Sequence, residues 1–188
     1  MTHFEYLAVA HTLIITFAVI RALSGFPTVA IGATRYWVHL SWLCMALVYC
    51  LLNFWLFWSF REIEWTLVGF ITFLVTPAVL YVYCSILVPS DPSSVRSWRD
   101  HFFAVRIPLF ATGLLFFVTI TFGNFRSLGT LNHPVIFGDL TFLAIYIVGL
   151  SQSRPGIHSL LALIPPLLFA VFALTVFNQP DVLTRVAP

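Results

Sequence analysis

Six long apolar runs, nearly free of charged residues, dominate this sequence of 188 residues. A helix needs about 20 consecutive apolar residues to cross the roughly 30 Å hydrocarbon core of a bilayer. In lipid, every backbone N–H and C=O group must be satisfied within the segment, and a continuous apolar run achieves this only as a helix. The sequence therefore predicts an all-α bundle of six transmembrane helices in a single domain, 1–188. The predicted spans are about 4–23, 36–60, 65–88, 107–124, 134–150 and 157–177.

The charge content excludes several classes of protein. Charged residues make up 9% of the chain, whereas a soluble domain carries roughly 25% because its surface must face water. The lipid bilayer is therefore the expected partner of the outer face. All nine basic residues are Arg, and the absence of Lys excludes a retinal Schiff base or a phosphate-binding P-loop. Nucleic acid is not an expected partner, because no basic stripe lies in a water-exposed region.

Several prolines are expected to shape the helices and their connections. Pro27 is predicted to follow the end of the first span, so that the apolar segment 26–34 lies at the membrane interface. The segment 90–106 is predicted to contain an interfacial helix that leads into the fourth span. Pro77 and the pair Pro165–Pro166 are predicted to kink or break the third and sixth helices.

The arginines predict the orientation of the chain in the membrane. With six spans, the following arginines fall on one side: Arg21, Arg35, Arg96, Arg99, Arg106 and Arg154. The remaining arginines fall on the other side: Arg61, Arg126 and Arg185. The positive-inside rule makes the richer side cytoplasmic, so both termini are expected on the non-cytoplasmic side.

Five short stretches, several of them rich in tryptophan, carry a resemblance. They are Arg35–Trp42 (RYWVHLSW), Asn53–Ser59 (NFWLFWS), Glu64–Thr66, Pro77–Tyr81 and Leu87–Asp91. Together they resemble a group of small, Trp-rich bacterial inner-membrane proteins for which no activity is known, over roughly residues 17–115. The resemblance implies a bacterial inner (plasma) membrane location and carries over no activity.

Asp139 is the most informative single residue, because an ionisable side chain inside a span is costly and is often functional. It lies near the start of the fifth predicted span, with His133 before it and Tyr146 on the same face two turns later. One interpretation is a proton- or cation-handling carboxylate that faces the interior of the bundle. The other is a carboxylate near the positive end of its helix, within reach of water or paired with an arginine. The sequence leaves both open.

Polar faces on the second and third spans supply further candidates. Tyr49 and Asn53 on the second, and Thr76 on the third, recur at helical spacing among small side chains. Such faces let helices pack closely and form hydrogen bonds in lipid, and they can equally line a polar pathway. With Asp139 and Tyr146, these residues are the candidates for the pathway or binding site of a channel or transporter for an ion or small molecule. Because the chain is short for a transporter, this hypothesis favours a homo-oligomer.

Metal and haem sites are weaker possibilities. The metal-ligand candidates are His11, His133, Glu62 and Glu64, imidazoles and carboxylates expected on the non-cytoplasmic side. No pair has a recognised ligand spacing such as HExxH, and scattered interfacial polar residues are the alternative explanation. A haem needs two facing axial ligands, and no histidine lies centrally in a span. No cofactor is therefore predicted, although metal and haem stay open.

No motif identifies an enzyme. The sequence contains no nucleophile elbow, glycine-rich phosphate loop or paired mid-membrane carboxylates, so no catalytic residue is assigned. The alternative to a channel or transporter is a non-catalytic subunit or assembly factor that packs against other membrane proteins. The high aromatic content, with 20 Phe, suits contact with protein and lipid. An intramembrane metal or haem protein is a third hypothesis.

Overall fold

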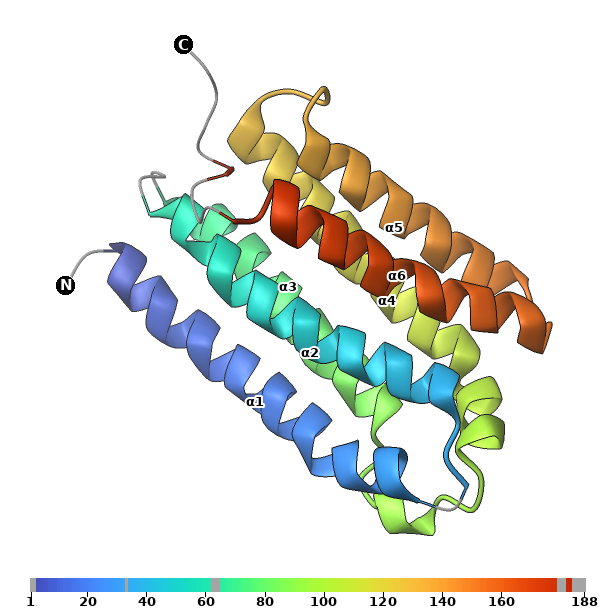
Figure 1. Ribbon diagram of the computed structural model, residues 1–188. Coiled ribbons are helices and arrows are strands. Elements are labelled where there is room, and N and C mark those ends of the chain that lie inside the picture. Colours follow the sequence, from blue (N-terminus) through green and yellow to red (C-terminus); the bar gives the residue numbers. More distant parts are fainter. Residues whose placement is uncertain (1–2, 33, 62–64, 179–181, 184–188) are drawn as a thin grey trace.

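The computed structural model describes residues 3–32, 34–61, 65–178 and 182–183. These residues contain no strand, and six of their helices are long and apolar enough to cross a membrane. The helices are α1 (His3–Ile31), α2 (Trp37–Phe57), α3 (Leu67–Leu87), α4 (Trp98–Leu128), α5 (Pro134–Ser151) and α6 (Pro155–Thr175), with short 3-10 turns η1 (Trp58–Phe60) and η2 (Pro92–Ser94). The predicted all-α six-helix bundle is confirmed, and it is the architecture of a multi-pass membrane protein (Figure 1).

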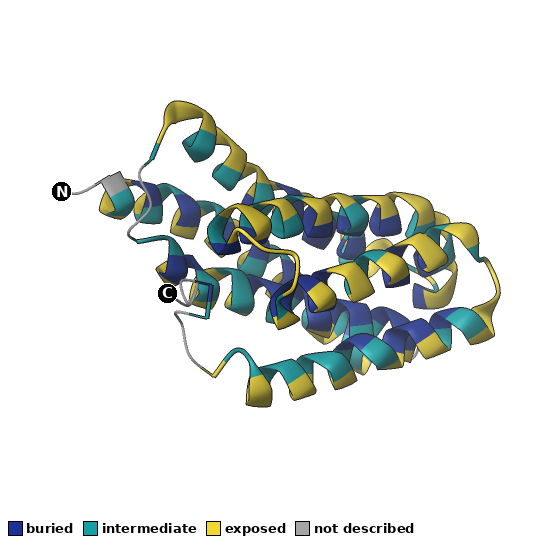
Figure 2. Ribbon diagram, turned by 90° about the horizontal axis from the view of Figure 1, so that it is seen from above, coloured by how far each residue is buried: buried dark blue, intermediate teal, exposed yellow. Residues whose placement is uncertain are grey.

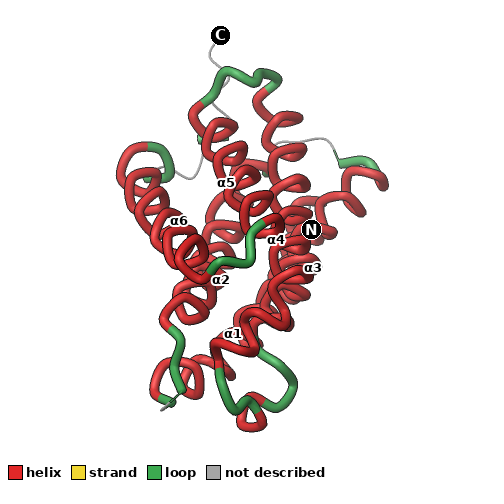
Figure 3. The backbone as a smooth tube through the Cα atoms, turned by 90° about the vertical axis from the view of Figure 1, so that its right-hand side faces the viewer, coloured by secondary structure: helices red, strands yellow, loops and turns green. Residues whose placement is uncertain are grey.

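The helices alternate in direction, so α1 begins and α6 ends at the same end of the bundle (Figure 1). We call this the terminal end and the other the opposite end. Neighbours in space are not always neighbours in sequence: α1 packs against both α2 and α3, and α2 packs against α6. The helix α4 lies between α3 and α5. Figure 3 shows the helices joined by short loops.

Local sequence signals fix several helix ends. The Ser97 hydroxyl accepts a hydrogen bond of 3.2 Å from the backbone N–H of Asp100 and so caps the start of α4. The helix ends at Gly129, whose φ of 65° is the left-handed conformation that glycine adopts without strain. At the start of α5, His133 Nδ1 accepts from the N–H of Val135 over 3.3 Å. His133 therefore acts as a helix cap.

Two helices extend beyond the predicted spans. The first helix, α1, continues to Ile31 with Pro27 inside it, so most of the predicted interfacial segment is helix. The reason is packing: a Cβ built on Gly25 would overlap the Val88 side chain, so α1 lies tightly against the end of α3. The fourth helix, α4, begins at Trp98, and its first turns bury the aromatic side chains of Trp98 and Phe102 in the bundle.

Prolines inside α3 and α6 do not end these helices. The first continues through Pro77, and the second through Pro165 and Pro166, where the prediction allowed for a break. In a membrane, packing against neighbouring helices compensates for the backbone hydrogen bond that proline removes. The prolines therefore leave the six spans continuous.

The outer face of the bundle is apolar. In Figure 2, exposed residues lie along the outward sides of the helices and buried residues face inward. Every helix exposes large apolar side chains, among them Leu13, Leu51, Ile71, Val118, Ile147 and Leu167. Water does not tolerate an apolar surface of this extent, whereas the hydrocarbon of a bilayer does. The surface thus fits a lipid environment.

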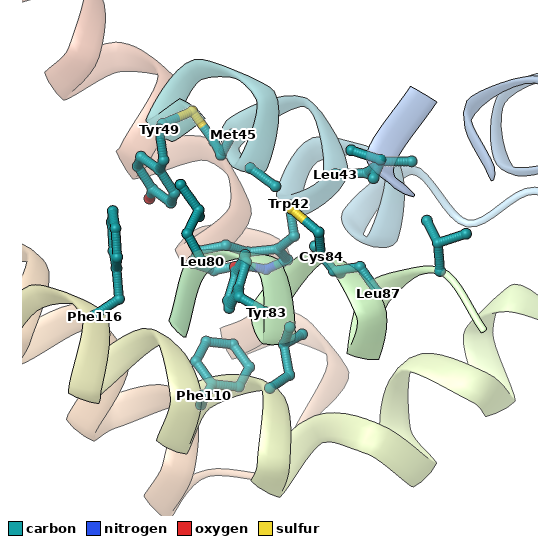
Figure 4. Close-up of a cluster of buried hydrophobic side chains, with 14 of the residues drawn as sticks. Trp42, Leu43, Met45, Tyr49, Leu80, Tyr83, Cys84, Leu87, Phe110 and Phe116 are labelled. Atoms are coloured by element: carbon teal, nitrogen blue, oxygen red, sulfur yellow. The ribbon is translucent and has the colours of Figure 1, made fainter. Parts of the chain in front are cut away.

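A densely packed aromatic core fills the half of the bundle towards the opposite end. Figure 4 shows part of it, with side chains from α2, α3 and α4 converging on Trp42 and Tyr83. The Trp42 ring lies 5.2 Å from Phe110 and 5.5 Å from Tyr146, between ring centroids. A Cβ on Gly113 would overlap the Tyr146 ring, so α4 and α5 approach closely here. Side chains therefore leave little space in this half.

Candidate functional site

A cavity of about 540 Å³ lies in the half of the bundle towards the terminal end. Its walls come from the C-terminal halves of α2, α4 and α6 and the N-terminal halves of α3 and α5. Exposed Thr66 and Arg126 belong to its lining, so the cavity reaches the surface at this end. Met45, Tyr49 and Phe116 form its floor. Pockets for small molecules measure about 300–1,000 Å³, so this volume suits a small organic ligand.

Four of the five side chains that the sequence suggested for a pathway line this cavity: Tyr49, Asn53, Thr76 and Asp139. They come from α2, α3 and α5 and meet only in the folded chain. Tyr146 is not among the lining residues. It is fully buried beneath the floor, where its hydroxyl donates to the Tyr83 hydroxyl over 3.1 Å.

Asp139 lies in the cavity wall with 7% of its side chain exposed. Asn124 Nδ2 of α4 donates a hydrogen bond of 2.8 Å to Asp139 Oδ2 of α5. This hydrogen-bond partner is a neutral amide. It is not an arginine, which was one of the partners that the sequence analysis left open for Asp139. The preceding Gly138 makes room for an aromatic ring, because a Cβ there would lie 2.8 Å from Phe172. The carboxylate therefore lies where α4, α5 and α6 meet.

Asn53 connects the cavity wall to α1. The fully buried His11 donates from Nε2 to Asn53 Oδ1 over 2.7 Å, and its ring stacks on Phe57 with 4.6 Å between centroids. His11 Nδ1 has no hydrogen-bond partner in the described part of the chain. Asn53 thus lines the cavity, and its side-chain oxygen accepts a hydrogen bond from His11 of α1.

The predicted metal ligands do not come together in the described structure. His11 binds Asn53, and His133 caps α5. Glu62 and Glu64 lie outside the described residues. Among residues 3–32, 34–61, 65–178 and 182–183, no three His, Cys, Asp or Glu side chains are close enough to hold a metal ion together.

The remaining lining combines hydroxyls with aromatic rings. The hydroxyl residues are Ser59, Thr66, Thr72, Thr76, Thr119 and Ser127. Aromatic side chains come from each of the five helices, and Phe117 stacks on Phe142 with 4.7 Å between parallel rings. A lining of this kind holds the apolar body of a ligand by contact and orients it through a few polar groups.

Phe177 and Leu183, which follow α6 in the chain, border the mouth of the cavity. Trp55 Nε1 donates to the carbonyl of Phe177 over 3.0 Å, and the Ser127 hydroxyl donates to the carbonyl of Leu183 over 3.0 Å. Phe177 and Leu183 both belong to the lining, and Leu183 is fully buried. These two residues thus contribute to the rim.

The sequence interpretation missed Asn124 and Phe172. Asn124 closes the fourth predicted span, fifteen residues before Asp139. A short connection between antiparallel helices brings such positions to the same depth, so this pairing had a detectable signal. Phe172 had no such signal, because nothing in the sequence distinguishes it from the other phenylalanines, of which the chain has 20 in all.

No protein-family model, curated protein or solved structure matches the chain. The cavity and its side chains are therefore the observations from which a function can be inferred. The resemblance to small, Trp-rich bacterial inner-membrane proteins remains a prediction, as does the orientation derived from the arginines.

Proposed function

We propose that the protein is a membrane carrier that binds a small organic solute in the cavity and moves it across the bilayer. The observation that supports this proposal is the asymmetry of the bundle along its axis. The cavity is open towards the terminal end, whereas the aromatic core around Trp42, Phe110 and Tyr146 fills the other half. A carrier exposes its binding site to one side of the membrane at a time.

The same asymmetry favours a carrier over a channel. An open channel needs a continuous aqueous path, but the cavity lining ends at Tyr49 and Phe116. Beneath them, Tyr83 and Tyr146 are at most 1% exposed. The homo-oligomer expected from the sequence is not required for this site, since one chain supplies all of the described walls.

Features of α3 and α6 suit a bundle that changes shape. Pro77 directly follows the cavity residue Thr76, and Pro165–Pro166 lie near the middle of α6. Proline removes an intrahelical hydrogen bond, and sharp bends in helices occur at such positions. Bending at these points would separate the helices of the opposite half while the cavity closes.

Flux into proteoliposomes tests the proposal. We would measure uptake of three solutes that share a benzyl group but differ in charge: benzyltrimethylammonium, benzylsulfonate and phenylalanine. The carrier predicts saturable uptake of at least one of them above the rate in protein-free vesicles. Flux of all three at the protein-free rate would contradict it.

A matched pair of variants on α4 links this flux to the cavity. Thr119→Phe fills the cavity, whereas Val118→Phe adds the same bulk to an exposed position on the outer face. Uptake should fall with Thr119→Phe and persist with Val118→Phe. Equal effects of the two variants would show that the flux does not pass through the cavity.

A further inference from the structure

We infer that the solute is an organic cation and that it binds Asp139 in exchange for a proton. The transport step of this exchange rests on the proposed carrier function. The binding step needs only the cavity, and it can be tested without a membrane.

The charges around the cavity point to a cationic ligand. Asp139 is the only acidic side chain in the described lining, and it lies in the buried wall. The positive side chain in that lining, Arg126, is exposed at the last turn of α4, where water screens its charge. From α2 the titratable neighbour is Tyr49, and from α1 it is His11 behind Asn53. In the described lining, α3 and α6 add no charged side chain and no histidine.

The buried Asp139 carboxyl group has a single, neutral side-chain donor among the described residues. This donor, the amide of Asn124, serves one of the two oxygens. An ionised carboxylate in an apolar site is strongly unfavourable unless a counter-charge or further donors compensate. The negative charge of the Asp139 carboxylate can be compensated in two ways: the carboxylate takes up a proton, or a ligand brings a positive charge next to it. The two exclude each other, so binding of the cation releases the proton.

The aromatic surroundings favour an organic cation over a metal ion. The Phe172 ring lies against Gly138, next to Asp139 in the chain, and Phe142 follows one helical turn later, stacked on Phe117. Aromatic faces attract ammonium groups through the ring quadrupole. A metal ion such as Ca²⁺ needs six or more oxygen ligands, and Mg²⁺ needs about six. A substituted ammonium group needs only the carboxylate and the rings.

The exchange conserves charge and protons. In the resting cavity Asp139 is protonated and neutral. When the cation enters, the O–H bond of the carboxyl breaks, the proton leaves to water at the open end, and the carboxylate pairs with the ammonium group. The site is neutral in both states, so either form can cross the low-dielectric interior. One cation therefore moves in one direction for each proton that moves in the other.

Binding in detergent tests the first step. The probes are benzyltrimethylammonium, which has no proton to lose, and benzylsulfonate, which places the opposite charge on a similar tetrahedral head. Calorimetry in buffers of different ionisation enthalpy measures both affinity and proton release. We expect the cation to bind with release of about one proton, and its affinity to fall by up to about tenfold per pH unit as the pH is lowered. Equal affinity for the two probes, or binding of the cation without proton release, would overturn the inference.

Two variants complete the test. Asp139→Asn keeps an oxygen that accepts from Asn124, so the fold should survive, but cation affinity should fall by about tenfold or more and proton release should vanish. The control is Asp100→Asn, which removes an exposed acid at the other end of the bundle and should change neither quantity. Unchanged cation affinity in Asp139→Asn would overturn the inference.

The two proposals fail separately. Cation binding with proton release but without flux in proteoliposomes would refute the carrier and leave the cation site. Flux of benzylsulfonate or phenylalanine, with no binding of the cation, would refute the cation site and leave the carrier.

Discussion

Asn124 donates its side-chain amide to the Asp139 carboxylate over 2.8 Å and thereby joins α4 to α5 in the wall of the cavity. Both side chains are nearly inaccessible, with 4% and 7% of their surface exposed. A buried polar pair of this kind stabilises the fold only while both partners are present, because each satisfies the other. The pair therefore belongs both to the stability of the bundle and to the proposed binding site.

Removal of the donor should destabilise the protein. Asn124→Ala leaves the Asp139 carboxylate without this amide, which should lower the free energy of unfolding by about 1–3 kcal/mol. Thermal unfolding in detergent measures the change. Adding Asp139→Leu to Asn124→Ala should recover part of the loss, because an apolar side chain leaves no buried polar atom without a partner. The control is Asn132→Ala, at an exposed position between α4 and α5, which should stay within about 0.5 kcal/mol of the parent protein.

Two glycines of α4 should respond in opposite ways to alanine. Gly113→Ala places a methyl group where the Tyr146 ring lies, which should displace the ring from Tyr83 and cost about 1–3 kcal/mol. Gly123→Ala meets nothing within 4 Å, and the loss of glycine from a helix should stabilise the protein by about 0.5–1 kcal/mol. Unfolding measurements that give the two variants the same sign would contradict the packing described for α4 and α5.

The hydrogen bond between His11 and Asn53 should hold α1 to the rest of the bundle. Asn53→Ala leaves the buried imidazole with no partner at either nitrogen, which should cost about 1–3 kcal/mol. Thr16→Ala is the control, because that exposed hydroxyl bonds only to the carbonyl of Thr12 in its own helix. Detergent unfolding curves should separate the two variants clearly. Coincident curves would show that this hydrogen bond does not stabilise the fold.

The sequence predicts the architecture well because the main constraint is chemical. Backbone groups in lipid require helices, and the apolar runs have the length to span the membrane, so six helices follow. Some helix ends could not be predicted from the sequence because tertiary contacts determine them. The end of α1 at Ile31 depends on the packing of Gly25 against Val88. The start of α4 at Trp98 depends on the burial of that side chain. The local signal at Pro27 predicted that the first helix would end before this residue, whereas α1 continues through it.

The candidate site is only partly visible in the sequence. Asp139 stands out as a charge in an apolar run, and Asn53 and Thr76 stand out as polar residues on a helical face. Their convergence on one cavity depends on α2 lying against α6 as well as α3. The hydropathy of the sequence does not determine which helices lie next to each other in space. For the same reason the sequence could not place Tyr146 beneath the floor rather than in the lining.

The orientation of the bundle remains a prediction from the arginines, and reporter fusions can test it. If the positive-inside rule holds, alkaline phosphatase fused after the last residue should be active in a bacterial host. Green fluorescent protein at the same place should stay dark, because it does not fold when exported through the general secretion route. The reverse pattern would place the cavity mouth on the cytoplasmic side.

Solvent access to the cavity tests the central claim, that water and solute enter the bundle from the terminal end only. In a chain with Cys44, Cys50 and Cys84 replaced by Ala, Thr76→Cys adds a single thiol to the lining and Ala46→Cys adds one to the packed core. A small, charged methanethiosulfonate applied to the membrane face where α1 begins should modify Thr76→Cys and spare Ala46→Cys. Benzyltrimethylammonium should slow the modification. Protection of Thr76→Cys from the reagent on that face, or equal reaction at both positions, would contradict the account.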